Sequence, residues 1–297
     1  MSRSAVAGTT APSPVSRGLK AVVLIAICAV VVLPFVGILS TSIAGRAQIT
    51  KAGGFVLLPD SASLSAYRAI FAGGVVTRAL VVSVAITVVG TLLSLTCTAL
   101  LAYSLSRPGS FGHKPMLMVV LFTLLFAPGI IPAYLVVKQL GLLNSYWSLV
   151  LPTAINAFNV IVMRAFFMGL PHELLESARI DGAGELTILR RLVLPLSRAV
   201  LAVIGLFYAV SYWNAFFNAL LYMNDTTKWP LQLVLRTYVV NNAPIGVNQL
   251  AGSGEALPPQ QSIQMAILVI SIVPILLVYP FLQRHFAKGV LTGAVKG

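Results

Sequence analysis

Residues 79–105 read ALVVSVAITVVGTLLSLTCTALLAYSL, and these 27 positions contain no Lys, Arg, Asp or Glu. A helix needs about 20 consecutive apolar residues to cross the hydrocarbon core of a bilayer. The stretch is followed by Arg107-Pro108-Gly109, a charged and turn-forming end. It therefore predicts a transmembrane helix.

Five further apolar runs lie on either side of this stretch, at residues 21–43, 116–137, 146–167, 199–221 and 263–282. The run 116–137 contains Pro128-Gly129 and Pro132, which predict a broken or bent helix. We expect an all-α, polytopic membrane protein with six transmembrane helices in one domain, because no soluble domain has room between the runs.

The composition excludes several other classes of protein. The chain has 297 residues, of which 58% are hydrophobic and only 9% are charged, and its mean hydropathy is +0.93. Soluble domains are roughly a quarter charged, so this chain is not expected to be a cytosolic enzyme, a disordered protein or a nucleic-acid binder. Cys28 and Cys97 lie within apolar runs and the three histidines are scattered, so we expect no metal site.

The positive charges predict the orientation of the spans. Lys and Arg number 20 against 7 Asp and Glu. If the N-terminus is inside, 13 of the 20 lie on the inner side and 7 on the outer side. Lys and Arg concentrate in cytoplasmic loops, so we expect an inner or plasma membrane protein with both termini in the cytoplasm. The expected parts are a cytoplasmic N-terminal tail 1–20, a six-helix transmembrane domain 21–287 with an extracellular loop 222–262, and a cytoplasmic C-terminal tail 288–297.

The inner loop 170–196 has an unusual composition. It holds four of the chain's seven acids within 13 residues, at Glu173, Glu176, Asp181 and Glu185. Pro171 fits the first position of a helix, Asp181-Gly182 breaks that helix, and Asp181 can cap a second one. Pro195 is expected to start the next span. An apolar stripe is expected from Leu174, Leu175, Ala178 and Ile180. The pattern predicts a helix–turn–helix that lies along the cytoplasmic membrane surface.

The same loop carries a resemblance to a known family. Its residues Glu176-Ser177-Ala178, Asp181-Gly182-Ala183 and Leu194-Pro195 resemble the "EAA" loop in the membrane subunits of binding-protein-dependent ABC importers, with Ser177 in place of the usual Ala. The resemblance implies that these eight residues form a coupling helix that docks on a separate ATPase subunit.

Two further stretches resemble sugar permeases of the maltose type. Tyr212-Trp213-Asn214 with Phe216-Phe217 resembles their "WN-x-F" motif, and residues 207–214 and 228–236 are similar to the branch that imports oligosaccharides of uronic acids. The ending Thr292-Gly293-Ala294-Val295-Lys296-Gly297 resembles a C-terminal tail that inserts between two ATPases. The resemblance thus implies a carbohydrate substrate and a tail that contacts the ATPases.

A sugar pathway needs hydrogen-bonding groups and flat apolar faces. The fifth run offers Tyr208, Tyr212 and Phe216 at a spacing of four, which is one helix face. The full set of candidate pathway residues is Asn156, Asn159, Tyr208, Tyr212, Trp213, Asn214 and Asn218. Amides inside a bilayer need hydrogen-bonding partners, so the alternative is that the asparagines join helices and the aromatic residues only pack.

The source of energy is expected to lie outside this chain. It contains no phosphate-binding G-x-x-x-x-G-K-[ST] stretch, and none of the six runs contains an acid of the kind that ion-coupled carriers place within their spans. We therefore expect a subunit that is not an enzyme and holds no cofactor, since ATP is bound by partner ATPases.

The resemblance implies that the partners are a second, related permease, two ATPase subunits and an extracellular solute-binding protein. The sequence shows no internal repeat, so the second half of the pathway is expected from the partner permease. The alternatives are an importer of a non-sugar solute such as a peptide or polyamine, an ion-coupled secondary transporter, and a membrane scaffold without transport.

Overall fold

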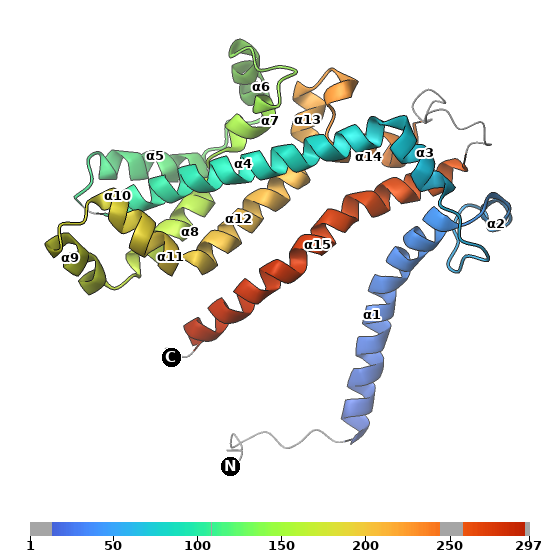
Figure 1. Ribbon diagram of the computed structural model, residues 1–297, viewed down its shortest axis with the longest axis horizontal. Helices are drawn as coiled ribbons and strands as arrows, with labels where there is room; N and C mark the ends of the chain where they lie inside the picture. Colours follow the sequence, from blue (N-terminus) through green and yellow to red (C-terminus); the bar gives the residue numbers. More distant parts are fainter. Residues whose placement is uncertain (1–13, 108, 244–257, 295–297) are drawn as a thin grey trace. The chain divides into compact units, whose positions relative to one another are not determined.

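A computed structural model describes residues 14–107, 109–243 and 258–294, with side chains up to residue 280. The chain is helical over these residues and forms no β-strand within them (Figure 1). The helices are α1 (Pro14–Ile43), α2 (Arg46–Lys51), α3 (Ser65–Gly73), α4 (Val75–Ser106), α5 (His113–Leu125), α6 (Ile130–Gln139), α7 (Trp147–Val150), η1 (Leu151–Thr153), α8 (Ala157–Met168), α9 (His172–Ile180), α10 (Glu185–Ile188), η2 (Leu189–Val193), α11 (Leu194–Leu196), α12 (Arg198–Trp213), α13 (Phe216–Tyr222), η3 (Thr226–Lys228), α14 (Leu231–Leu235), η4 (Arg236–Val240) and α15 (Gln260–Ala294).

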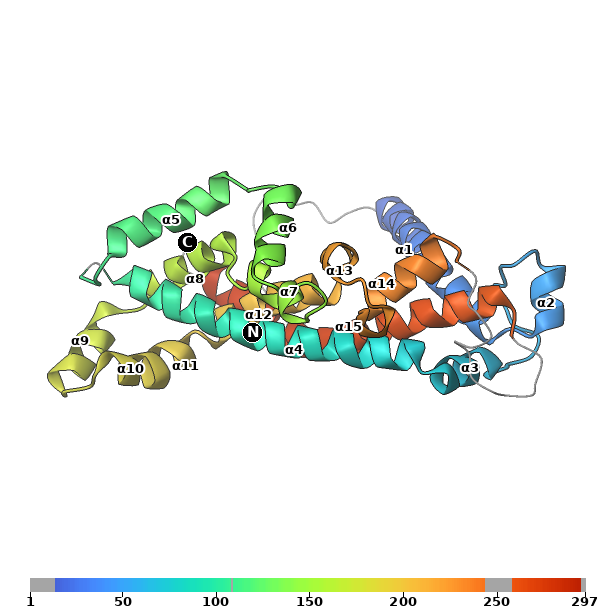
Figure 2. The ribbon, with the colours of Figure 1, turned by 90° about the horizontal axis from the view of Figure 1, so that it is seen from above.

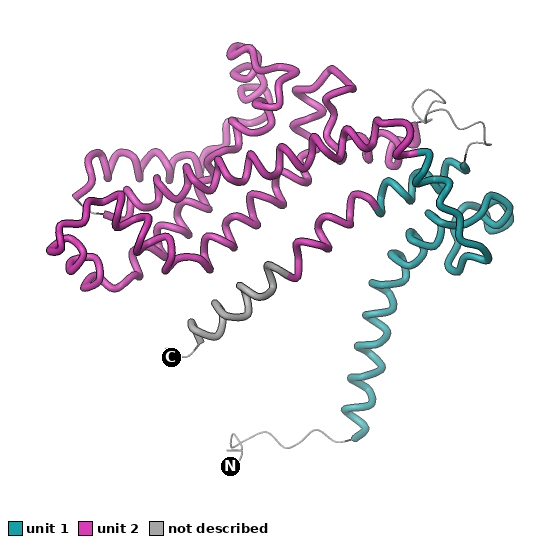
Figure 3. Tube along the Cα trace, in the orientation of Figure 1, with its two compact units in different colours: residues 1–69, 255–269 teal, residues 70–254, 270–297 magenta. Residues whose placement is uncertain are grey.

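The chain divides into two compact units (Figure 3). The first comprises residues 1–69 and 255–269. In it, the loop after α1 folds back onto the end of that helix: Thr41 Oγ1 accepts a hydrogen bond from the backbone N of Val56 (2.9 Å), and the hydroxyls of Ser42 and Tyr67 lie 2.8 Å apart. Ser262 of α15 donates to the carbonyl of Thr41 over 3.4 Å. These bonds satisfy polar groups that are buried at the end of an apolar helix.

The second unit, residues 70–254 and 270–297, is organised around α4. This helix packs along α12 and α8 (Figures 1 and 2). Its contact surface is rich in small buried residues, namely Gly90, Ser94, Thr98, Ala99 and Ala102. Small side chains let helix backbones approach closely where both helices are apolar. This packing brings the inner loop and the fourth and fifth apolar runs onto one central helix.

Three of the predicted spans are broken in the structure. The predicted break at Pro128-Gly129 is confirmed, because α5 ends at Leu125 and α6 begins at Ile130. The fourth run consists of Trp147–Thr153 and Ala157–Met168, bent by 52°. The fifth run is interrupted after Trp213, where Asn214 ends α12 before α13 begins. The prediction that the fourth and fifth runs are single spans is wrong. An apolar composition does not show that Asn156 starts a new helix or that Asn214 ends one.

Among the described residues, three helices are long and apolar enough to cross a membrane, at Pro14–Ile43, Val75–Ser106 and Gln260–Pro280. The number rises to five if each of two bent helix pairs is one span. The count of six stays a prediction. Helix α1 begins at Pro14, so the end of the predicted N-terminal tail is helical, and α15 continues to Ala294.

Candidate functional site

The inner loop forms a helical hairpin, which we define as residues 172–196. Helix α9 follows Pro171 and ends at Ile180, and Gly182 then adopts a φ of +81°, a value that favours glycine. The backbone N of Ala183 donates to the carbonyl of Ala178 over 2.9 Å, which closes the turn. The predicted order of helix, turn and helix is thus present, and its position along the membrane surface stays a prediction. The residue before α10 is Gly184, so the prediction that Asp181 caps the second helix is wrong: the turn uses three more residues.

One face of α9 is buried and the rest is exposed. Leu175 is 2% exposed and belongs to the core of the second unit, and Ala178 packs against that core. Ile180, by contrast, is 86% exposed and Leu174 is about half exposed. The expected apolar stripe therefore contains Leu175 and Ala178 only, because Ile180 lies on another face at 3.6 residues per turn.

The second arm of the hairpin runs from Glu185 to Leu196 and meets α12 at an angle of 84°. It includes a π-helical turn at Leu189–Val193, of the kind that often occurs at functional sites. Pro195 lies inside this arm, and the bend comes at Ser197, whose backbone N donates to the carbonyl of Val193 over 3.0 Å. The prediction that Pro195 starts the span is wrong, since α12 begins at Arg198.

Six of the eight predicted coupling residues lie on α9 and in the turn that follows it. Glu176, Ser177, Asp181 and Gly182 are exposed, and Ala178 and Ala183 are partly covered. Leu194 and Pro195 lie on the second arm. Thr292, Gly293 and Ala294 fall in α15, where only the backbone is described, and Val295, Lys296 and Gly297 lie outside the described residues.

Glu185 is the best connected acid of the hairpin. One carboxylate oxygen pairs with Arg179 Nη2 at 2.9 Å, and the other accepts a hydrogen bond from the hydroxyl of Tyr103 at the end of α4. The hydrogen bond from Tyr103, and then those from Arg179, lower the pKa of the Glu185 carboxyl below its ordinary value. Tyr103 was not among the predicted site residues, because it lies 82 positions away from Glu185. The signal in the sequence was its place near the end of an apolar run.

A second cluster lies at the break in the fourth run. Asn156 caps α8, because its Oδ1 accepts a hydrogen bond from the backbone N of Asn159 over 3.1 Å. The backbone N of Asn156 donates to the hydroxyl of Tyr208 over 3.0 Å, and that hydroxyl lies 2.6 Å from the hydroxyl of Thr98 on α4. One tyrosine thus joins α12, α4 and the break.

Tyr212 repeats this arrangement one turn further along α12. Its hydroxyl lies 2.7 Å from the hydroxyl of Ser94 and donates to the carbonyl of Val150 over 3.3 Å. Tyr208 and Tyr212 are both buried. Trp213 is also buried, and its Nε1 has no hydrogen-bond partner within the part of the chain that the structure describes. A role for these residues in a solute pathway stays a prediction.

The remaining candidate pathway residues lie apart from this cluster. Asn214 is exposed at the end of α12 and its Nδ2 donates to the carbonyl of Val210 over 2.9 Å. Phe216 and Asn218 belong to α13, beyond the break. Phe216 therefore does not continue the helical face of Tyr208 and Tyr212, and it packs under Arg236, whose Cζ lies 4.8 Å from the centre of its ring. The structure thus groups Asn156, Asn159, Tyr208 and Tyr212 only.

The predicted loop 222–262 is partly helical. Helix α14 packs on α4, and the backbone N of Leu231 donates to Ser83 Oγ over 2.7 Å. At the start of the loop, Asn144 Oδ1 accepts hydrogen bonds from the backbone N of Asn224 (2.6 Å) and Asp225 (3.0 Å). Hydrogen bonds from Thr227 lower the pKa of the Asp225 carboxyl. The first part of this loop is therefore held in place by hydrogen bonds to Asn144 and Ser83.

Comparisons with known proteins agree with this arrangement. A family described as "binding-protein-dependent transport system inner membrane component" matches residues 98–292. The polygalacturonan/rhamnogalacturonan transport system permease protein YtcP of Bacillus subtilis (strain 168) is 49% identical over 90% of this chain and 93% of its own length. Protein LplC of the same organism is 48% identical over 91% and 90%.

A solved structure is also similar to the chain. It is described as a bacterial ABC transporter involved in the import of the acidic polysaccharide alginate, and it matches with a TM-score of 0.83 and 31% identity over 94% of this chain and all of the other. The family match and the identities together establish that the chain belongs to the inner membrane components of binding-protein-dependent transport systems.

Proposed function

We propose that this chain is a permease subunit of an ATP-driven importer of oligosaccharides and that it forms half of the transmembrane pathway. Its family consists of ABC transporter permease components, which are not enzymes. The similar permease YtcP belongs to a system for polygalacturonan and rhamnogalacturonan, and the similar structure belongs to an importer of the acidic polysaccharide alginate. These relatives favour a fragment of an acidic polysaccharide over a peptide, a polyamine or an ion-coupled solute.

The proposed assembly contains a second six-helix permease, two ATPase subunits that bind the ATP, and an extracellular solute-binding protein. In it this chain crosses the membrane six times with both termini in the cytoplasm. The excess of Lys and Arg on that side supports the orientation. The outer surface around Asn144 and Asp225 then faces the solute-binding protein.

The hairpin is the proposed docking element for an ATPase, and its surface is the observation that carries the proposal. It presents the apolar side chains of Leu174, Ile180 and Leu186, which are 48%, 86% and 56% exposed. The acids Glu176 and Asp181 are exposed beside them. Large apolar side chains that stay exposed among charged ones are typical of a protein interaction site, and a slim corner built on Gly182 fits a cleft.

The proposed cycle needs no chemistry in this chain. Closure of the ATPases on ATP moves the hairpin, and the helices packed on α4 then rock between inward-open and outward-open states. Asn156, Asn159, Asn214 and Asn218 are proposed to offer hydrogen-bonding groups to the sugar, with Tyr208, Tyr212 and Trp213 beside them. The tail Thr292–Gly297 is proposed to contact the ATPases.

Uptake by the reconstituted complex tests the proposal. Proteoliposomes with both permeases, the ATPases and the binding protein are expected to import labelled galacturonate or alginate oligosaccharides with ATP inside, and vanadate but not a proton uncoupler should stop the import. Uptake of none of these sugars, or loss of uptake with the uncoupler alone, contradicts the proposal.

The hairpin is tested by Gly182→Asp, which is expected to abolish uptake and ATPase docking while the protein stays in the membrane. Gly112→Asp is the matched control, because Gly112 also has a positive φ (+69°) and open space where a Cβ would lie. Equal uptake by both variants contradicts docking at the hairpin.

A further inference from the structure

One polar contact joins the hairpin to the central helix of the second unit. The hydroxyl of Tyr103 donates to Glu185 Oε2, and the same hydroxyl lies 3.5 Å from the carbonyl oxygen of Glu185. Glu185 is the first residue of the second arm, and Tyr103 lies in the last turn of α4. The contact therefore connects the point where the hairpin turns with the end of the helix that α8 and α12 pack against.

Both partners of this contact are held in place by other groups. The rings of Tyr103 and Phe167 are packed edge to face, with their centres 6.4 Å apart. The guanidinium of Arg107 lies over the Tyr103 ring, with Cζ 4.8 Å from the ring centre. Arg179 of α9 donates to Glu185 Oε1 from Nε (3.1 Å) and Nη2 (2.9 Å), a forked geometry that fixes the carboxylate.

The end of α4 is itself tied to α8. Arg164 Nε donates to the carbonyl of Leu105 over 2.7 Å, which satisfies one of the last carbonyls of that helix. The positive charge also suits the negative end of the helix dipole. Because the end of α4 is bonded to α8, we expect a movement of Tyr103 to move both helices.

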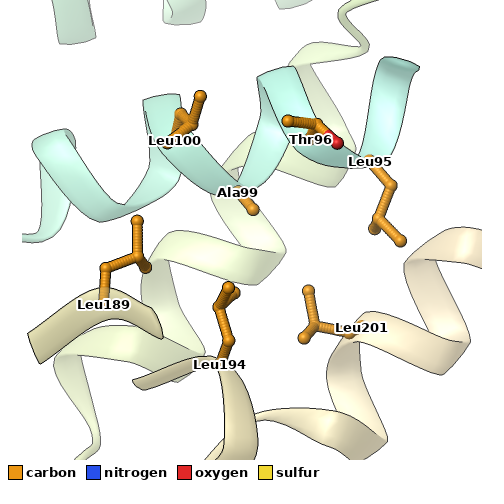
Figure 4. A pocket seen from close by; sticks show the side chains of 7 residues that line it. All are labelled: Leu95, Thr96, Ala99, Leu100, Leu189, Leu194 and Leu201. Carbon is orange, nitrogen blue, oxygen red and sulfur yellow. The ribbon is translucent and has the colours of Figure 1, made fainter. Parts of the chain in front are cut away.

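The second arm also borders an apolar pocket. A pocket of about 200 Å³ separates the second arm from α4 and α12 (Figure 4). It is lined by Leu189 and Leu194 of the arm, Leu201 of α12, and Leu95, Thr96, Ala99 and Leu100 of α4 (Figure 4). Ile188, Leu189 and Val193 of the same arm are buried in the core of the second unit, so a shift of the arm moves residues that pack directly on that core.

From these contacts we infer that Glu185 is a positioning residue. Its hydrogen bond with Tyr103 couples movement of the hairpin to α4, and thereby to α8 and α12, which pack on α4. The inference rests on the proposed function, because it assigns the link between a docked hairpin and the transmembrane helices. Docking itself is assigned to the exposed tip, whereas Glu185 and Tyr103 make a contact inside the chain.

Three variants of the full complex test this role. Tyr103→Phe removes the hydroxyl and keeps the ring, Glu185→Leu removes the acceptor, and the double variant removes both. Each single variant loses the hydrogen bond between Tyr103 and Glu185, so we expect it to import about threefold to tenfold fewer sugars per ATP hydrolysed. The double variant is expected to match the single variants, because all three lack the same bond.

Two further variants separate coupling from general damage. Glu185→Gln keeps an oxygen that accepts from Tyr103 and is expected to restore at least half of the wild-type ratio. Tyr146→Phe removes an exposed hydroxyl from a tyrosine at the start of the fourth run and is expected to leave the ratio unchanged. Hydrogen exchange of residues 183–189 should rise in Tyr103→Phe and stay at the wild-type level in Tyr146→Phe.

A wild-type ratio of imported galacturonate trisaccharide to ATP in Tyr103→Phe overturns the inference, and so does an additive effect in the double variant. Neither result contradicts the proposed function. The proposed function is contradicted if the wild-type complex shows no ATP-driven uptake of any of the tested sugars.

Discussion

Gly90 of α4 lies directly beneath the ring of Tyr212 of α12, and a Cβ atom built on Gly90 would come within 2.9 Å of that ring. The ring cannot move away without loss, because its hydroxyl is bonded to Ser94 and to the carbonyl of Val150. The contact fixes how closely the two helices approach.

Gly90→Ala is therefore expected to destabilise the chain by about 1–3 kcal/mol, the usual effect of an overpacked core. Gly205→Ala is the matched control on α12, since a Cβ there would lie 3.6 Å from Leu95, an ordinary contact. Thermal unfolding of the purified complex in detergent measures both. Equal unfolding temperatures in the two variants would show that the approach at Gly90 is not tight.

The role of Asn156 can be separated into capping and solute contact. Asn156→Ala is expected to lose about 1 kcal/mol of stability, because the backbone N of Asn159 loses its acceptor. Serine is an equally good cap, so Asn156→Ser should restore stability. If Asn156 also contacts the sugar, Asn156→Ser should still change the order of preference in a competition assay with labelled oligosaccharides. Wild-type preference in both variants would remove Asn156 from the pathway.

The sequence was a sufficient guide wherever local chemistry decides the structure. The helical fold follows from the apolar runs, and the hairpin follows from Pro171 and from Gly182, which takes a φ of +81°. Both depend on residues that are neighbours along the chain, so their spacing carries the information.

The sequence was a poor guide wherever distant segments meet. Tyr103 and Glu185 are 82 positions apart, and Thr98 and Tyr208 are 110 apart. Nothing near these residues marks their partners. The breaks at Asn156 and Asn214 were missed for a related reason: an amide within an apolar run can join helices or end one, and only the fold decides which.

Glu185 gives the stability of the chain a dependence on pH. Its pKa is lowered in the folded chain by Tyr103 of α4 and Arg179 of α9, with a smaller effect of Arg107. A lowered pKa stabilises the fold at pH values above the unfolded pKa of about 4.3, and this stabilisation is lost as the pH falls through the folded value. The effect is below about 1 kcal/mol, because the Glu185 side chain is 54% exposed.

Unfolding temperatures measured between pH 7 and pH 3 check this expectation. Glu185→Gln should reduce the loss of stability on acidification, because the amide does not titrate. Identical profiles for the wild type and Glu185→Gln would contradict the assigned interactions of Glu185.

The pocket between the second arm and α4 offers a test of hairpin mobility. Ala99 points into this pocket from α4 (Figure 4), so Ala99→Leu places apolar atoms in open space. We expect the variant to be as stable as the wild type or up to about 1 kcal/mol more stable. It should hydrolyse ATP and import sugar more slowly, because the filled pocket holds Leu189 and Leu194 in place.

Ala102→Leu is the control: Ala102 is fully buried on the same helix, and the larger side chain there should destabilise the chain by overpacking. Faster turnover in Ala99→Leu would contradict the expected restraint of the second arm, and equal destabilisation by both substitutions would show that the pocket has no room for the larger side chain.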